Sequence, residues 1–335
     1  MSVERIVGAV LVGAFFWMHS RNRPVVSAEF QRFFERFHDA IKLEENDGRR
    51  KLREKRDVIL ATLERGLALH SLTFEAFDQG SYAMRTGVVP KDGNYDIDVG
   101  LIFDCLRDRF PDPVALKRLV RDVLSAHNRK VKIRRACVTV EYWKKGIPDY
   151  HVDLALYVKV DDCLELASGK EHSEPQLCKW ERSAPRELTR YVLAKHTGDD
   201  QAQFRRCIRY LKRWRDENFR SGAPFSIALT AAAAAWFKPK QTSNGAYVDA
   251  EALHFLVRKM RSNFGNGFDS SRLAIRVKGI VKHDLMGRTT TPQMQVFDEK
   301  LERLELALKS CFGDVNISDS VATLARLFGS DFPTS

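Results

Sequence analysis

The 335-residue sequence lacks several features that would narrow its class at once. Its six cysteines form no C-x-x-C pair, so we expect neither a zinc site nor a dithiol redox motif. No stretch is rich in Pro, Gly or Ser, and no repeat of solenoid period occurs, which excludes long low-complexity segments and repeat arrays. The cysteines interrupt apolar or helical patterns, as reduced thiols do in a reducing cytoplasm, at positions 105, 137, 163, 178, 207 and 311.

Long apolar runs are also scarce. The conspicuous one, residues 6–18, is shorter than the roughly 20 residues that span a bilayer as a helix. Glu4-Arg5 makes a poor signal n-region, and no small-x-small cleavage site follows the run. We therefore treat residues 1–26 as a segment of uncertain role: a packed or interaction helix, with a membrane anchor or an export signal as alternatives. The expected location is the cytoplasm, with membrane association through residues 6–18 left open.

Positive charge, in contrast, is abundant. A net charge of +11 and a pI near 9.4 concentrate polyanions such as NTPs, nucleic acid or anionic lipid, without choosing among them. The densest cluster, residues 49–56, begins a helical pattern over 49–70. Because a charge run on a helix is usually a solvated face, and cations at a helix N-terminus oppose its dipole, this cluster does not by itself establish nucleic-acid binding.

Hydrophobic periodicity divides the chain into two halves. Strands are predicted at 72–77, 94–103, 131–142 and 150–160, and helices at 49–70 and 112–127, after a stripe of phenylalanines at 30, 33, 34 and 37. Strand signals then largely disappear, and helices follow at 185–196, 199–219, 224–237, 248–264, 292–311 and 318–328. We predict an α+β fold in which a mixed β-sheet with helices (27–170) precedes an all-α lobe (171–335), with an active site in the cleft between them.

Paired acids occupy one predicted strand, Tyr95-Asp96-Ile97-Asp98-Val99. Residues two apart in a strand project from the same face, so Asp96 and Asp98 point together and repel. Asp153 interrupts a second, largely apolar strand and supplies a third carboxylate. Hard oxygen ligands of this kind suit two Mg²⁺ ions, although Mn²⁺ also fits them.

A Gly-Ser turn precedes the acidic strand. At Gly80 the missing side chain lets backbone N–H groups approach a phosphate closely, and Ser81 adds a hydroxyl donor. Alone, a D-x-D can be an exposed strand end and a Gly-Ser pair a plain turn. Their order, together with Asp153, predicts a two-metal phosphoryl-transfer site.

At this point the sequence resembles a known superfamily. The run 79–103, with Asp153 after it, resembles the polymerase-β-like nucleotidyltransferases. The pattern Gln-Gly-Ser-x-x-x-x-Thr is similar to the bacterial cGAS-like and DncV-like enzymes (CD-NTases) of antiphage signalling, which make cyclic oligonucleotides. The resemblance implies a nucleotidyltransferase palm with an all-α C-terminal lobe. It also implies that Asp96, Asp98 and Asp153 are catalytic metal ligands, and that the nucleotide is held by the turn residues Gln79, Gly80 and Ser81.

A second stretch extends the resemblance into the helical lobe. Residues 204–214, followed by Pro224-Phe225-Ser226, are similar to the family's triphosphate-binding Lys and following Ser, which implies these roles for Lys212 and Ser226. Helical periodicity places Ile208 and Leu211 inward. The competing interpretation of Lys212 is an ordinary solvent-exposed lysine.

Two aspects stay open at this level. The segment between Ser81 and Asp96 is slightly longer than in many relatives, so its position over a nucleotide is undetermined. Base selection would fall to residues lining the cleft, among which the sequence alone cannot choose; candidates are Tyr82, Arg134, Tyr142, Asn218 and His283.

The resemblance implies a template-independent enzyme that joins NTPs, ATP and GTP or a related pair, into a cyclic dinucleotide second messenger. Its partners would be the NTP substrates, a downstream cyclic-nucleotide effector and a possible regulatory protein, without activation by duplex nucleic acid. One alternative is a linear, oligoadenylate-synthase-like or RNA-tailing enzyme. Another is a non-catalytic nucleic-acid-binding scaffold, although three clustered carboxylates repel phosphate and argue against it.

Overall fold

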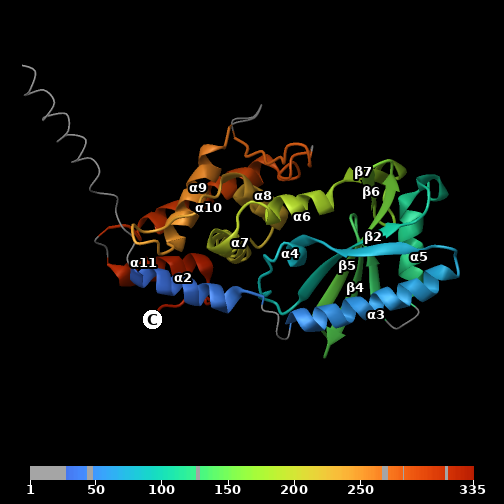
Figure 1. Ribbon diagram of the computed structural model, residues 1–335, viewed down its shortest axis with the longest axis horizontal. Coiled ribbons are helices and arrows are strands. Elements are labelled where there is room, and N and C mark those ends of the chain that lie inside the picture. Colours follow the sequence, from blue (N-terminus) through green and yellow to red (C-terminus); the bar gives the residue numbers. More distant parts are fainter. Residues whose placement is uncertain (1–27, 44–47, 126–128, 266–270, 282, 314–315) are drawn as a thin grey trace, which may run out of the picture.

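The computed structural model describes residues 28–43, 48–125, 129–265, 271–281, 283–313 and 316–335. The apolar run 6–18 lies outside these residues. Figure 1 shows a sheet-containing palm on the right and a helical lobe on the left. Within the described part of the chain, no helix is both long and apolar enough to cross a membrane.

A seven-stranded mixed sheet forms the palm. Its strands run in the order β1-β2-β5-β4-β3, with β6 paired to β5 and β7 to β6. Only the β2–β5 pair among these is parallel, and the other pairs are antiparallel. The bounds are β1 Phe74–Asp78, β2 Tyr95–Phe103, β3 Lys130–Ile133, β4 Val138–Lys144, β5 Ile147–Val160, β6 Cys163–Ser168 and β7 Lys179–Ser183.

Two amphipathic helices, α3 (Gly48–Ala68) and α5 (Pro113–Ser125), contribute to the palm core. The leucines and isoleucine of α3 are fully buried at positions 52, 59, 63 and 67, so this face of the helix packs into the core. The backbone N–H of Val114 donates to Asp112 Oδ1 over 2.9 Å, so Asp112 caps the N-terminus of α5. Two short turns of helix complete the palm, α4 (Gly80–Ala83) and η1 (Arg107–Arg109).

The expectation that strands largely end at residue 160 is wrong. Strands β6 and β7 continue the sheet to Ser183, past the residue-170 boundary proposed from the sequence. Both strands are short and carry polar residues, so their stability comes from pairing with β5 and with each other rather than from an apolar run. The predicted strand 131–142 is likewise divided into β3 and β4.

The helical lobe follows the predicted pattern closely. Its six predicted helices are present, each within three residues of the expected bounds: α6 Pro185–Leu193, α7 Gly198–Asn218, α8 Ser226–Trp236, α9 Asp249–Ser262, α10 Thr291–Lys309 and α11 Ile317–Phe328. A short 3-10 turn, η2 (Pro175–Leu177), precedes β7. Alanines 231–233 of α8 are almost completely buried, so neighbouring helices pack close to its backbone.

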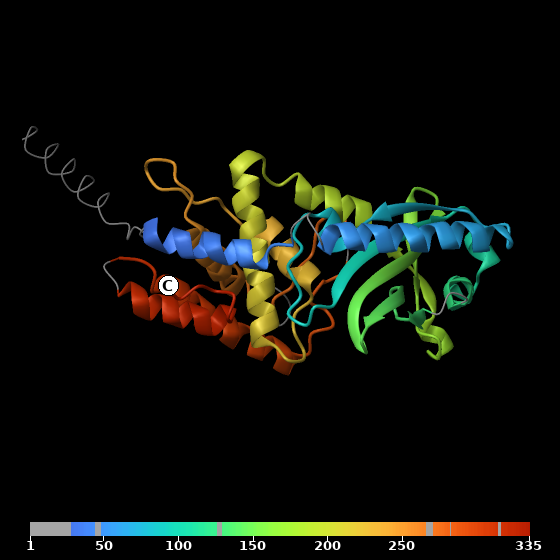
Figure 2. The ribbon, with the colours of Figure 1, turned by 90° about the horizontal axis from the view of Figure 1, so that it is seen from below.

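Helix α2 (Ala28–Ile41) belongs by packing to the helical lobe. Its phenylalanine stripe faces the core of that lobe, since Phe30, Phe34 and Phe37 are buried there. The rings of Phe37 and Phe328 lie 4.9 Å apart, and Figures 1 and 2 place α2 beside α11 at the end of the molecule far from the sheet. From the sequence we expected this helix in the nucleotidyltransferase core (27–170), because an apolar stripe does not reveal which core it enters.

Candidate active site

Three carboxylates lie on one face of two neighbouring strands. In β2, Ile97 and Val99 are buried in the palm core, while Asp96 and Asp98 project to the opposite face. The parallel register of β2 and β5 sets Asp98 directly beside Asp153. Residues 55 positions apart in the sequence are therefore neighbours in the sheet.

Burial and mutual repulsion alter the acidity of this group. The pKa of Asp98 is raised to about 7, first by burial and then by the negative charges of Asp96 and Asp153. The Thr139 hydroxyl on β4 donates to Asp153 Oδ1 over 2.6 Å. Asp153 is thus held in place by a hydrogen bond from the neighbouring strand. Asp98 is the carboxylate whose charged form is disfavoured by burial and by repulsion.

The three carboxylates have the chemistry of a divalent-cation site but not its close grouping. Among the described residues, no three acidic, His or Cys side chains are gathered closely enough to form a complete metal site. The three carboxylates nevertheless share one face, and a cation beside them would offset the repulsion that raises the Asp98 pKa. Hard carboxylate oxygens suit Mg²⁺ or Mn²⁺ rather than a soft metal.

The Gly-Ser turn lies against the same carboxylates. Gly80 has a φ of +64°, and a Cβ at this position would overlap the carboxylate of Asp98. The backbone N–H of Gln79 donates to the Asp98 carbonyl over 3.1 Å, which ties the turn to β2. Only glycine allows this left-handed conformation and this close approach together.

A cavity of about 560 Å³ brings most of the predicted site residues together. We call it the Lys212 cavity. The palm contributes Gly80, Ser81, Asp96 and Asp98, and the helical lobe contributes Lys212, Arg215 and Ser226. Of the other two predicted residues, Asp153 lines a neighbouring cavity, and Gln79 accepts a hydrogen bond from the Tyr157 hydroxyl over 3.0 Å.

Lys212 is not the exposed lysine that the sequence allowed as an alternative. Its side chain is 4% exposed, and Nζ donates to the Thr86 carbonyl over 2.9 Å and to Thr86 Oγ1 over 3.1 Å. Burial lowers the pKa of Lys212 to about 8. The threonine that closes the Gln-Gly-Ser-x-x-x-x-Thr pattern therefore joins the palm to α7.

Two cavity residues were missed by the sequence analysis. Arg215 Nη1 donates to the hydroxyl of Ser226 at the start of α8, and Asp216, whose pKa is raised by burial, lines the same cavity. They follow Lys212 by three and four residues, a spacing that places side chains on one helix face. That spacing was available in the sequence and would have identified both.

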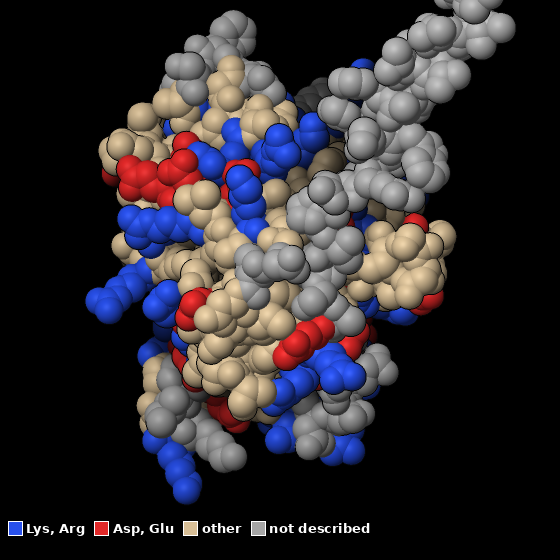
Figure 3. All heavy atoms as spheres, turned by 90° about the vertical axis from the view of Figure 1, so that its left-hand side faces the viewer, with Lys and Arg blue, Asp and Glu red and all other residues tan. Residues whose placement is uncertain are grey.

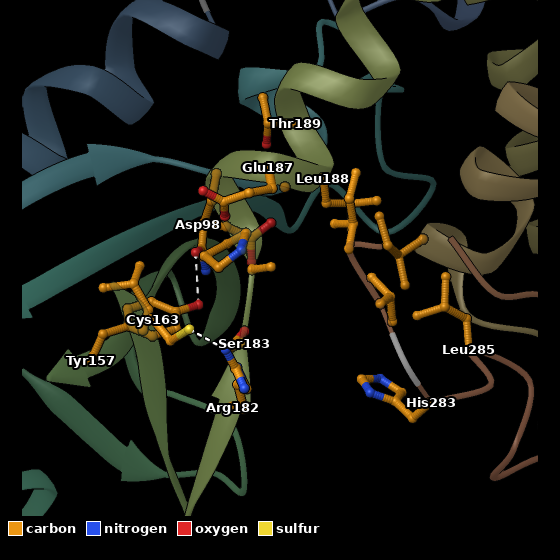
Figure 4. Close-up of a pocket in the computed structure, with 18 of the residues that line it drawn as sticks. Asp98, Tyr157, Cys163, Arg182, Ser183, Glu187, Leu188, Thr189, His283 and Leu285 are labelled. Carbon is orange, nitrogen blue, oxygen red and sulfur yellow. Dashed lines mark hydrogen bonds between the residues drawn. The ribbon is translucent and has the colours of Figure 1, made fainter. Parts of the chain in front are cut away.

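A second cavity, of about 590 Å³, adjoins the first at Gly80, Met84, Asp98 and Ile227. We call it the Arg182 cavity. In Figure 4, Asp98, Tyr157 and Arg182 lie on the palm side, facing His283 and Leu285 of the helical lobe. Arg182 is on β7, a strand without a clear sequence signal, so sequence analysis had no basis for selecting it.

A third cavity, of about 290 Å³, lies on the other side of the triad. It is lined by Asp153 together with Asn94, Arg134, Trp143 and His151. Nδ1 of His151 lies 3.0 Å from Asn94 Oδ1, so these two side chains share a hydrogen bond. Asp98 and Asp153 thus open onto different hollows although they are neighbours in the sheet.

The five candidates for base selection separate into two groups. His283 lines the Arg182 cavity, and Arg134 lines the cavity beside Asp153. The other three line none of these cavities: Tyr82 is in the palm core, Lys55 lies over the ring of Tyr142, and Asn218 donates to the carbonyls of Trp214 and Leu327.

Known families match both lobes of the chain. The family described as "Cyclic GMP-AMP synthase DncV-like, nucleotidyltransferase domain" matches residues 74–157. The family described as "Cyclic GMP-AMP synthase, C-terminal domain" matches residues 201–335. Each range falls within one of the two lobes described above.

Solved structures agree over nearly the whole chain. Vibrio cholerae DncV, a cyclic AMP-GMP synthase, has 17% identity and a TM-score of 0.70, over 90% of this chain and 96% of that chain. Bradyrhizobium diazoefficiens CdnG in complex with GTP has 15% identity and a TM-score of 0.72, over 89% and 94%. Escherichia coli DncV in its 3'-deoxy GTP bound form has 14% identity and a TM-score of 0.65, over 88% and 94%. At these identities, the likeness establishes a shared fold. With both lobes matched by DncV family domains, the chain belongs to the DncV-like nucleotidyltransferases.

Proposed function

We propose that this protein is a template-independent synthase that joins ATP and GTP, or a related pair, into a cyclic dinucleotide. One observation carries the proposal: two cavities between the lobes meet at Asp98. Two nucleotides bound in adjoining cavities would present a triphosphate and a hydroxyl to one set of carboxylates. Repeating the transfer on a reoriented linear intermediate would close the ring.

The Lys212 cavity has the groups that a triphosphate needs. The backbone and hydroxyl of the Gly80-Ser81 turn supply neutral donors, and Lys212 and Arg215 supply positive charge. Two of the three N–H donors of Lys212 go to Thr86, which leaves one for a phosphate oxygen. Arg215, held by Ser226, approaches from the opposite lobe.

Metal ions complete the chemistry that the family uses. Two Mg²⁺ ions (or Mn²⁺) held by Asp96, Asp98 and Asp153 would lower the pKa of the attacking hydroxyl and offset charge on the triphosphate. The chain's own groups then have separate tasks. Asp153, fixed by Thr139, orients the hydroxyl side, while the Gly80 turn and Lys212 orient the α-phosphate for attack.

The relatives support this choice of substrates. One structure of Vibrio cholerae DncV contains the linear intermediate 5' pppA(3',5')pG, and CdnG contains GTP. By extension, we propose ATP and GTP as substrates and a linear intermediate on the route to the product. A signalling role in antiphage defence, through a cyclic-nucleotide effector, is part of the same proposal, as are a cytoplasmic location and a regulatory protein partner.

Mass spectrometry of products from all four NTPs with Mg²⁺ tests this function. The expected result is a cyclic dinucleotide that resists phosphatase, with two pyrophosphates released per product. A phosphatase-sensitive linear product would instead favour the oligoadenylate-synthase-like or RNA-tailing alternative. Absence of pyrophosphate release from every NTP mixture and metal would contradict the proposal, and Asp96→Asn is the matched inactive control.

The scaffold alternative is less well supported. In the basic cluster of α3, Arg56 pairs with Asp78 at 2.7 Å, and Arg50 lies 3.8 Å from Glu54. Figure 3 views the helical-lobe end of the molecule, and there the visible Lys and Arg are interspersed with Asp and Glu rather than gathered in one stripe. Steep salt dependence of duplex binding without NTP turnover would revive this alternative.

A further inference from the structure

Residues 84–91 form a loop between two elements of the palm, α4 and β2, but this loop packs against the helical lobe. Val89 N donates to the Ile41 carbonyl at the end of α2 over 2.9 Å. Three basic side chains of α7 donate to its carbonyls: Arg209 to Arg85 and Gly87, Lys212 to Thr86, and Arg213 to Val89. Thr86, Val88 and Pro90 of this loop form one wall of the Lys212 cavity.

Arg213 is the most enclosed of the three basic side chains. It is 2% exposed, its Nη2 donates to the Val89 carbonyl over 2.8 Å, and its Nε lies 3.0 Å from Asp331 Oδ2. Among the described residues, neither Nε nor Nη1 has a hydrogen-bond partner, so Asp331 contacts this guanidinium as an ion pair without a hydrogen bond. A buried guanidinium depends strongly on its paired carboxylate, and Asp331, one-third exposed on its side chain, is the acidic group paired with Arg213.

The segment after α11 that carries Asp331 is itself firmly packed. Phe332 is 2% exposed, and its ring centroid lies 5.1 Å from that of Phe37. At Gly329, with a φ of +79°, a Cβ would overlap the Glu217 carboxylate, which in turn pairs with Lys91 at 2.6 Å. Residues 329–332 therefore contact α7 at the two side chains, Arg213 and Glu217, that hold the loop at Val89 and Lys91.

We propose that Asp331 is a positioning residue for the nucleotidyl transfer: through Arg213 it fixes Val89, and with it the loop wall of the triphosphate cavity. The kinetic part of this inference rests on the proposed function. The carboxylates are held by the sheet rather than by the loop, so loosening the loop weakens NTP binding more than the bond-making step.

The test is Asp331→Asn, with Asp319→Asn as the matched control on the exposed first turn of α11. We expect the NTP KM to rise about tenfold with kcat within about twofold, since small misplacements of binding groups have effects of this order. Amide hydrogen exchange at residues 86–89 should accelerate in the absence of NTP. Asp331→Glu should recover most of the KM, and Asp319→Asn should match wild type in both measurements.

A double variant tests the route. If Asp331 acts through Arg213, then adding Arg213→Lys to Asp331→Asn should raise KM no further than the larger single effect. Additive effects would overturn the route, and unchanged KM and exchange in folded Asp331→Asn would overturn the proposal.

Two further outcomes are informative. If wild-type protein does not turn over NTPs, the proposed function fails, while the exchange measurement still decides whether Asp331 holds the loop. If Asp331→Asn does not fold, Arg213→Lys provides the test, because it keeps a positive charge beside Asp331 and removes the Nη2 donor to the Val89 carbonyl. It should accelerate exchange at residues 86–89, and unchanged exchange would then count against the proposal.

Discussion

Lys117 in the palm and Lys212 in the helical lobe are both buried, and both donate to backbone carbonyls. Nζ of Lys117 contacts the carbonyls of Arg134, Arg135 and Gly169 at 3.0, 2.6 and 3.1 Å, much as Lys212 contacts Thr86. Burial lowers the pKa of each to about 8. What differs is the surroundings: Lys212 lines a cavity beside Asp96 and Asp98, whereas Lys117 lines none of the three cavities described here.

The contrast shows that burial and a depressed pKa do not identify a functional lysine. Lys117 fastens α5 to the β3–β4 turn and to the end of β6, a structural task in which all three N–H donors are used. Lys212 combines a structural bond to the loop with access to a cavity that contains carboxylates. Perturbed groups mark a site only together with a cleft and partner groups.

Carboxylates lie beside Lys212 and not beside Lys117 in a cavity, so neutralising one of them should have the largest effect on activity. We expect Asp98→Asn to lower pyrophosphate release by about a thousandfold, the scale on which loss of a preorganised charge-stabilising group acts. The variant should unfold at the same or a higher temperature than wild type at pH 8, because a repelled, partly buried charge is removed. Retention of more than a tenth of the activity would contradict the assignment.

The next effect concerns the turn that borders the same cavity. Gly80→Ala should lower kcat/KM by about a hundredfold, because the new Cβ displaces the Asp98 carboxylate. Gly93→Ala is the matched control, with a φ of +71° and nothing within 4 Å of the added Cβ. Both variants should lose about 1 to 2 kcal/mol of stability from the left-handed backbone. If Gly80→Ala and Gly93→Ala have equal activities, then contact between the turn and the Asp98 carboxylate does not matter for activity.

Replacing the two lysines tests the comparison directly. Lys212→Met should lower kcat/KM by about ten- to a hundredfold through loss of charge at the cavity and of the Thr86 bond. Lys117→Met should leave the NTP KM unchanged and lower the free energy of unfolding by about 1 to 3 kcal/mol, since its three carbonyls lose their donor. Steady-state kinetics and thermal melts separate the two outcomes. A changed NTP KM in Lys117→Met would contradict the view that Lys117 is structural and only Lys212 binds substrate.

The last prediction concerns the pH dependence of stability rather than catalysis. Asp98 has an ordinary pKa of 3.8 in the unfolded chain and about 7 in the folded one, so the folded state binds more protons between these values. The free energy of unfolding should therefore fall as pH rises from about 4 to 7, and this component should be absent in Asp98→Asn. Mg²⁺ should raise the melting temperature of wild type more at pH 8 than at pH 5.5. Parallel pH profiles of the two proteins would contradict the assigned pKa.

Local patterns predicted much of the fold. The six helices after residue 184 were predictable from local sequence: five carry an apolar period, and α8 is an apolar, alanine-rich run. Start signals such as Pro185 in α6 and Thr290 at α10 mark where helices begin. The cysteines, expected to be reduced, are all free. Strands β6 and β7 were not predictable, since β6 exists by pairing with β5 and β7 by pairing with β6, and Arg182 was missed with them.

The sequence by itself determined which side chains share an element face. Alternation in β2 pairs Asp96 with Asp98, and helical spacing puts Lys212 on one face of α7 with Arg215. Only the tertiary structure decided that Asp153 adjoins Asp98, that Lys212 bonds Thr86, and that Asp331 reaches Arg213. The physical reason is one of range: backbone periodicity fixes neighbours within a few residues, whereas contacts across 55 to 126 positions depend on strand register and on the packing of two lobes.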